Sequence, residues 1–99
     1  MINLCWFKEF ESDFDTGSIT DFLIDSVPYS KTKAIDYLKR GNKIASCPRK
    51  IKDPITKEVL CESFSVLSDG EYCWVDVLPL LIEKYNIRLP KEFCKRIDD

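Results

Sequence analysis

Cysteines and carboxylates are the side chains with which this 99-residue chain could do chemistry, because it contains no histidine. Five cysteines could bind a metal ion or act as nucleophiles, and 17 aspartates and glutamates could bind a metal ion or transfer protons. A structural zinc site usually contains a Cys-x-x-Cys pair, since two ligands then share one turn. No such pair occurs, and the number of cysteines is odd. We therefore expect small buried thiols in a reducing compartment and no metal ion.

One alternative for the cysteines stays open. Cys61 and Cys73 flank a predicted hairpin, so their side chains could lie close enough for a disulfide.

The chain lacks the usual parts of an active site. Without histidine it can form neither a Ser-His-Asp nor a Cys-His arrangement. Its only glycines are Gly17, Gly41 and Gly70, so it has no glycine-rich phosphate loop. Exposed acids are the ordinary state of a protein with this composition. We predict that the protein is not an enzyme and uses no cofactor.

Charge is strongly segregated along the chain, although the formal net charge is only −2. Residues 1–28 carry one base and six acids, whereas residues 29–57 carry nine bases and two acids. Either block could form a binding surface for a partner of opposite charge.

Phenylalanines alternate with acids in the opening segment, which reads KEFESDFDTGSITD from Lys8 to Asp21. Carboxylates speed association with a basic protein, and buried aromatic rings supply binding energy. A plainer interpretation is that the rings belong to the core and the acids face water. We predict a partner-binding surface formed by Glu9, Phe10, Glu11, Asp13, Phe14, Asp15, Asp21 and Asp25.

The basic block, residues 31–57, offers an alternative function in nucleic-acid binding or regulation. Its lysines and arginines could contact phosphates. Only Tyr29 and Tyr37 lie in this region, so bases would find few rings to stack on. The net negative charge also disfavours direct binding to nucleic acid.

No apolar run approaches the roughly 18 residues of a membrane span. The apolar start, residues 2–7, is too short for a signal peptide and has no basic beginning. We expect a soluble, cytoplasmic protein without a membrane partner.

These candidate residues must be held by a small set of secondary-structure elements. Residues 2–7 could form a short strand or an extended arm. Ser18 followed by Asp21 has the spacing of a capping box, so we predict a helix over residues 19–26 that ends before Pro28.

A second helix is predicted over residues 31–40, with Ser30 as its N-cap and Gly41 as a left-handed terminator. Residues 43–47 then form a short strand, and the basic, proline-containing residues 48–56 form a loop.

The alternating pattern of residues 57–67 predicts one strand, and residues 72–75 return as its partner. Asp69-Gly70 between them favours a type I′ hairpin turn.

Two helices close the chain. Asp76 is the expected cap of a helix over residues 77–85, and Pro79 lies in its first turn, where a missing N–H does no harm. Leu89-Pro90 begins the last helix.

Together these elements predict an α+β fold in a single domain, residues 1–99. A short antiparallel sheet with its hairpin at Asp69-Gly70 would pack against about four short helices.

The second half of the chain combines an Asp-Gly turn, a strand with a tryptophan, an apolar helix and a Leu-Pro helix start. The residues are Tyr37, Leu38, Gly41, Asp69, Gly70, Trp74, Leu78, Tyr85, Leu89, Pro90 and Phe93. Over residues 35–97 this pattern resembles small bacterial immunity proteins of toxin–immunity systems, which include contact-dependent growth inhibition and polymorphic toxins. The resemblance lies in the scaffold, since a fold does not define a function.

The resemblance implies an inhibitor in the bacterial cytoplasm that binds its cognate toxin domain and blocks the toxin's active site. Such a toxin would be basic if it were an RNase or a DNase, because its active site attracts phosphates. Contact residues vary among immunity proteins, so the resemblance assigns none here.

Overall fold

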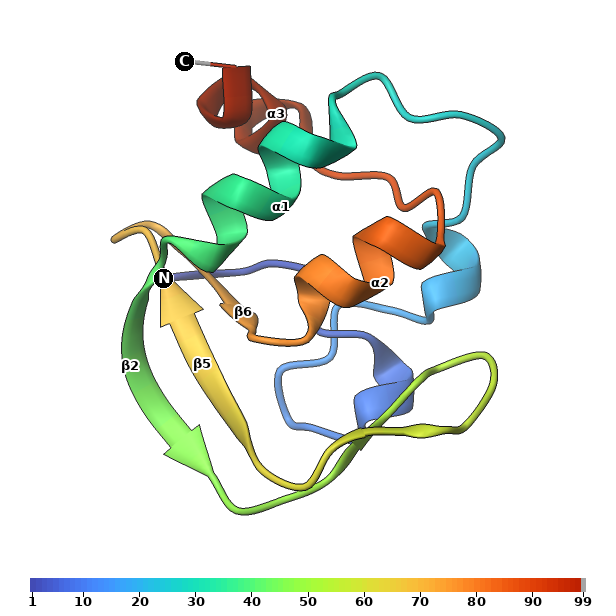
Figure 1. The fold of residues 1–99 in the computed structure, drawn as a ribbon, viewed down its shortest axis with the longest axis vertical. Helices are drawn as coiled ribbons and strands as arrows, with labels where there is room; N and C mark the ends of the chain where they lie inside the picture. Colours follow the sequence, from blue (N-terminus) through green and yellow to red (C-terminus); the bar gives the residue numbers. More distant parts are fainter. Residues whose placement is uncertain (99) are drawn as a thin grey trace.

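The computed structural model describes residues 1–98 (Figure 1). Within this range the chain forms three α-helices, two short 3-10 helices and six strands. Their order is β1 (Ile2–Asn3), η1 (Lys8–Phe10), η2 (Ile19–Asp21), α1 (Lys31–Lys39), β2 (Asn42–Cys47), β3 (Ile51–Lys52), β4 (Val59–Cys61), β5 (Phe64–Ser68), β6 (Tyr72–Val75), α2 (Leu78–Lys84) and α3 (Lys91–Asp98). The α+β class is confirmed, and the expected number of about four helices is slightly too high.

The main sheet has four strands in the order β1-β6-β5-β2. β2, β5 and β6 are antiparallel, whereas β1 runs parallel to β6. The sheet is therefore mixed and not purely antiparallel. The amide of Ile2 donates to the carbonyl of Glu71 (2.7 Å) and that of Leu4 to Cys73 (2.9 Å), so the start of the chain pairs with the hairpin. Both hairpin strands consequently lie inside the sheet, and β2 forms an outer edge (Figure 1).

The hairpin of β5 and β6 is confirmed, but its turn is not of type I′. That turn needs two central residues with positive φ, and of the turn residues only Gly70 has one (101°). The carboxylate of Asp69 stabilises the turn: its Oδ1 accepts hydrogen bonds from the amides of Glu71 (3.0 Å) and Tyr72 (2.8 Å).

Helix α1 forms as predicted, with the Ser30 hydroxyl accepting a hydrogen bond from the Lys33 amide (3.3 Å). Gly41 follows it but does not have a left-handed backbone. A glycine is needed there for another reason. A Cβ at Gly41 would stand 2.7 Å from Cζ2 of Trp74 and 3.1 Å from Cβ of Leu67, so only glycine lets the chain pass this close to the indole.

The helix predicted over residues 19–26 is wrong beyond its first turn, η2. The amide of Ile24 donates to the carbonyl of Asn86 (3.0 Å), and the amide of Arg88 donates to the carbonyl of Phe22 (2.7 Å). These bonds to a segment far along the chain replace the bonds that a longer helix would have made.

The strand predicted over residues 57–67 is interrupted. β4 and β5 are separate, and β4 pairs with β3 in a second, two-stranded sheet, so the predicted loop at residues 48–56 contains a strand. Asp76 does not cap α2. Its Oδ2 accepts a hydrogen bond from the amide of Ser65 (3.1 Å), and Val77 takes the cap position, while Pro79 lies in the first turn as predicted.

Aromatic rings from three elements meet in the core. Trp74 of β6 is fully buried, and its ring lies against Phe93 of α3 (5.9 Å between centroids) and Tyr37 of α1 (6.4 Å). The Nε1 of Trp74 donates to the carbonyl of Leu38 (3.2 Å), so its one polar atom is satisfied. Among residues 1–98, no helix has the length and apolar character needed to cross a bilayer.

Trp74→Ala should lower the free energy of unfolding by about 3–5 kcal/mol, because it opens a cavity where α1, α3 and β6 meet. Urea denaturation followed by circular dichroism measures this change. Leu80→Ala is the matched control, since Leu80 is an exposed residue of α2, and its effect should stay within about 0.5 kcal/mol. Equal losses in the two variants would contradict this description of the core.

Candidate partner-binding surface

The predicted surface begins in a loop that leaves the core and returns to it. The amide of Thr16 donates to the carbonyl of Trp6 (2.8 Å), and the amide of Lys8 donates to the carbonyl of Gly17 (2.8 Å). Gly17 has a φ of 120°, which favours glycine where the loop closes. The intervening residues 11–15, called here the acidic loop, therefore project from a fixed base.

Two of the predicted binding residues serve the fold instead. Phe10 is 5% exposed and packs against Phe7 in the core. The carboxylate of Glu9 accepts hydrogen bonds from the Ser18 hydroxyl (2.5 Å) and the Ile19 amide (3.0 Å), which fixes the start of η2. Burial raises the pKa of Glu9, but these hydrogen bonds outweigh it and the pKa is lowered overall. Glu9 and Phe10 therefore have structural roles in the fold, and their predicted contact with a partner stays a prediction.

The acidic loop keeps three carboxylates and one aromatic ring at the surface. Glu11, Asp13 and Asp15 are exposed and form no ion pair within residues 1–98. One oxygen of Asp15 is used within the loop, since its Oδ1 accepts a hydrogen bond from the Gly17 amide (2.6 Å). Phe14 is 53% exposed and rests edge-on against Trp6 (5.1 Å between centroids). Charge and apolar area thus lie side by side.

The remaining two predicted acids lie apart from this loop. Asp21 ends η2, and Asp25 follows it, where its carbonyl accepts a hydrogen bond from Nδ2 of Asn86 (2.8 Å). Both carboxylates are exposed, and they too are without ion pairs among the described residues. They add negative charge to the same half of the chain but do not line the cavity described next.

A groove of about 450 Å³ separates the acidic loop from strand β2. Its apolar lining is formed by Trp6, Phe14, Ala45, Cys47, Phe64 and Val66. Its polar lining is formed by Glu11, Ser12, Asp13, Ser46 and Arg49. Local sequence patterns do not predict this groove, because its lining residues come from segments as far apart in the chain as Trp6 and Val66.

Arg49 holds the acidic loop against the rest of the molecule. Its Nη1 donates to the carbonyl of Glu11 (3.0 Å) and its Nη2 to the carbonyl of Phe10 (3.1 Å). The guanidinium carbon also lies 5.7 Å from the ring centre of Phe64. Nη1 and Nη2 therefore bind the loop, whereas the buried Nε of Arg49 has no hydrogen-bond partner among residues 1–98. Arg49 belongs to the basic block of the sequence, but in the structure it holds the acidic loop in place.

The rest of the basic block is divided between two places. Its first bases lie on α1, whereas residues 49–57 lie in and around the β3–β4 segment at the opposite side of the molecule (Figure 1). Lys57 donates to the carbonyl of Pro54 (3.0 Å), and Lys50 pairs with Glu62 (3.6 Å). Lys43 lies between these two places in the chain, on β2.

Asp53 was overlooked by the sequence analysis, although Asp-Pro is a turn signal. Its carboxylate is fully buried and accepts hydrogen bonds from the amides of Ile55 (2.8 Å) and Thr56 (3.1 Å), from Nζ of Lys84 (2.9 Å) and from the hydroxyl of Tyr85 (3.0 Å). Burial alone would raise the pKa of Asp53, but these donors outweigh it and lower the pKa to about 2. The carboxylate ties the β3–β4 turn to the end of α2.

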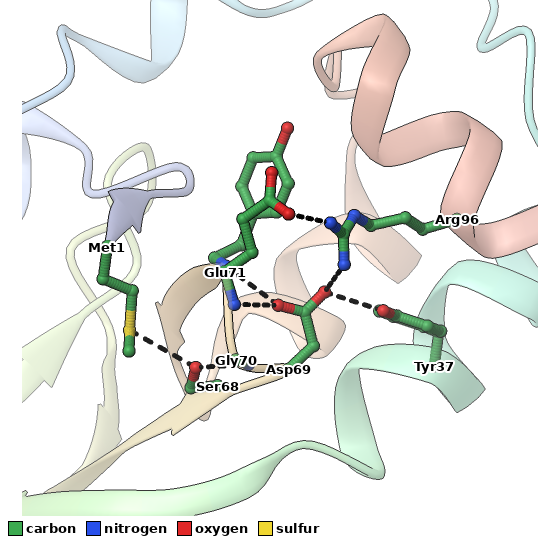
Figure 2. Close-up of polar contacts among 8 residues, drawn as sticks. Met1, Tyr37, Ser68, Asp69, Gly70, Glu71 and Arg96 are labelled. Carbon is green, nitrogen blue, oxygen red and sulfur yellow. Dashed lines mark hydrogen bonds and ion pairs between the residues drawn. The ribbon is translucent and has the colours of Figure 1, made fainter.

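A partly buried acid, Asp69, joins the hairpin to two helices (Figure 2). Oδ2 of Asp69 accepts hydrogen bonds from the hydroxyl of Tyr37 on α1 (2.7 Å) and from Nη1 of Arg96 on α3 (3.2 Å). Arg96 also pairs with Glu71 and lies over the ring of Tyr72 (5.4 Å). Every member of this network has a partner inside the protein, which indicates a structural role.

The thiols do not form a site. All five cysteines are free, so Cys61 and Cys73 are not joined. Burial raises the pKa of Cys5 to about 12, and it raises the pKa of Cys61, Cys73 and Cys94 as well. These thiols are therefore protonated at neutral pH and poorly nucleophilic. Within residues 1–98, no group of three potential metal ligands comes together.

Comparisons of the chain with protein-family models, with curated proteins and with solved structures found no match.

Asp53→Asn should lower the free energy of unfolding at pH 7 by about 1–3 kcal/mol, because an amide cannot accept from all the donors that now converge on the carboxylate. The pKa of Asp53 lies below its ordinary value of 3.8. The stabilisation is therefore present above about pH 4 and is lost as the pH falls toward about 2. Urea denaturation at several pH values measures both effects.

Glu62→Gln is the matched control, since Glu62 belongs to an exposed ion pair whose loss should change stability by no more than about 1 kcal/mol. If the difference between Asp53→Asn and the unmodified protein stayed constant from pH 7 to about pH 2, the assignment of a charged, buried carboxylate would be wrong.

Proposed function

We propose that this protein is a non-enzymatic binding protein of the immunity type. It binds a basic toxin domain through the acidic loop and the adjoining groove, and it blocks the toxin's active site. One observation carries the proposal: among residues 1–98, Glu11, Asp13 and Asp15 form no ion pair, and they flank the exposed ring of Phe14 beside an apolar groove.

This arrangement has the two components of a protein interface. Carboxylates at the rim attract a basic partner over a distance and raise the rate of association. An aromatic ring beside an apolar groove buries apolar surface when a partner binds. A few such residues supply most of the binding energy of a typical interface. The hydrogen bonds of Arg49 to the carbonyls of Phe10 and Glu11 keep the loop in place, which reduces the entropy lost on binding.

The class of partner is inferred from chemistry and from the resemblance. A nuclease domain is basic where it binds phosphates, so an acidic surface fits its active site and competes with the substrate. The likeness of residues 35–97 to immunity proteins points in the same direction. The core of the proposed surface is Glu11, Asp13, Phe14 and Asp15, with Asp21 and Asp25 contributing long-range charge.

The alternative function, binding of nucleic acid by residues 31–57, has less support because the bases are spread over α1, β2 and the β3–β4 segment, and Arg49 and Lys50 have contacts within the protein. Titration with tRNA and with duplex DNA at two salt concentrations distinguishes the two functions. Binding that weakens steeply with salt would favour the alternative.

The proposal is tested by co-expressing the protein with the products of the neighbouring genes, followed by pull-down at moderate salt. The variant Glu11→Lys/Asp13→Lys/Asp15→Lys should then reduce the association rate by about 10- to 1,000-fold, while circular dichroism and the unfolding midpoint stay close to those of the unmodified protein. Stopped-flow fluorescence or surface plasmon resonance measures the rate.

The control variant reverses three other exposed acids to lysine: Glu58, Glu83 and Glu92, which form no ion pair in the described part of the chain. It changes the net charge by the same amount, so a selective loss in the first variant locates the interface. Failure of every neighbouring gene product to bind, or equal slowing by both variants, would count against the proposal.

A further inference from the structure

The outer edge of β2 is open along its whole length. β2 is the last strand of the sheet and pairs only with β5. No other hydrogen bond from residues 1–98 reaches its backbone. It forms the outer side of the sheet in Figure 1, where no other segment runs along it. Such an edge presents unpaired N–H and C=O groups to whatever strand approaches.

The start of this edge is protected by a bulge. The register with β5 shifts between Lys43 and Ala45, which leaves Ile44 as an extra, 51% exposed residue. A bulge and a lysine are devices that discourage pairing of edge strands. The stretch from Ala45 to Cys47 carries no charge and no bulge, and Pro48 directly after it limits strand pairing to these three residues. These residues also line the apolar groove.

The groove beside Ala45–Cys47 favours particular side chains on a strand that pairs with β2. Ala45, Ser46 and Cys47 of β2 line the groove together with Glu11, Asp13 and Phe14 of the acidic loop. Arg49 lines it too, so two acids and one base leave the lining with a net negative charge. A strand added to β2 would place every second side chain on the face of the sheet that carries the groove. The carboxylates of this lining favour lysine or arginine on the added strand, and the ring of Phe14 favours an apolar residue between them.

A second copy of this chain fits the site less well. The six residues of β2 contain a single base, Lys43, next to the bulge. Two copies of β2 would therefore bring little positive charge to Glu11 and Asp13. Charge complementarity selects a different, basic chain.

We infer that the partner binds by β-strand addition: an extended basic segment pairs with β2 at Ala45–Cys47 and inserts an apolar side chain beside Phe14. Main-chain hydrogen bonds supply affinity in this mode of recognition, and alternate side chains supply specificity. The inference rests on the proposed function and adds to it the conformation of the partner and the pattern of its side chains.

A peptide of defined sequence tests the inference without the natural partner. The probe is acetyl-Thr-Lys-Thr-Val-Thr-Lys-Thr-amide, whose threonines favour an extended backbone and whose Lys, Val and Lys share one face. Titration into the ¹⁵N-labelled protein up to about 1 mM detects even weak binding by NMR. We expect shifts and slower amide exchange in residues 45–47, together with shifts in residues 11–14.

Two N-methylated peptides separate strand pairing from simple charge attraction. One carries methyl groups on the amides of the Lys and Val residues, and the other on the amides of alternate threonines. Only one set of amides faces β2 in an added strand, so one peptide should lose binding and the other should keep it. Equal binding of both peptides would overturn strand addition.

Variants of the protein test the selectivity. Glu11→Lys/Asp13→Lys should weaken binding of the unmethylated peptide by about 10-fold or more. Asp21→Lys/Asp25→Lys, with the same change in net charge outside the groove, should weaken it much less. The inference is wrong if the two variants lose affinity equally, if no shift occurs in residues 45–47 at the highest concentration, or if the protein alone dimerises through β2 in light scattering.

The outcomes distinguish this inference from the function on which it rests. A toxin that binds with the expected dependence on Glu11, Asp13 and Asp15, while β2 amides keep their exchange rates in the complex, would leave the proposed function standing and overturn strand addition. If the peptide bound at β2 but no neighbouring gene product bound the protein, strand addition would stand and the proposed function would be overturned.

Discussion

The close approach of the backbone at Gly41 to the buried ring of Trp74 is the constraint on which the rest of the structure depends. The indole fills the space between β6, α1 and α3, and its Nε1 donates to the last turn of α1 through the carbonyl of Leu38. A side chain at Gly41 would overlap that ring. The step from α1 into β2 is therefore fixed by packing, and with it the position of β2 at the edge of the sheet.

Buried and partly buried carboxylates hold the irregular segments onto this core. Asp53 fastens the β3–β4 turn to α2, Asp69 fastens the hairpin to α1 and α3, and Glu9 fastens the opening segment to η2. Each accepts several hydrogen bonds, which offsets the cost of removing a charge from water. Acids that look equivalent in the sequence therefore fall into two groups: those whose carboxylates are hydrogen-bonded within the fold, and those that stay exposed to solvent.

The free acids define the surface that remains for function. Glu11, Asp13 and Asp15 share a loop whose ends are fixed by main-chain hydrogen bonds and whose neighbour is an apolar groove. Arg49, which follows β2 in the chain, donates hydrogen bonds to the carbonyls of Phe10 and Glu11 and so connects the loop to the end of β2. Charge, an exposed ring and an open strand edge are consequently held at fixed distances from one another, as recognition of a specific partner requires.

The sequence by itself determined the α+β class, helix α1, the β5–β6 hairpin, the position of Pro79 in the first turn of α2 and the exposed acids of the loop. These features depend on local rules: caps, turn residues and the alternation of apolar side chains. Tertiary structure alone decided that Glu9 and Phe10 are structural, that residues 22–26 pair with residues 86–88, that β1 joins the sheet in parallel, and that β2 lies beside the acidic loop. Each of these outcomes depends on which distant segment supplies the hydrogen-bond partner or the packing surface, and local sequence carries no record of that choice.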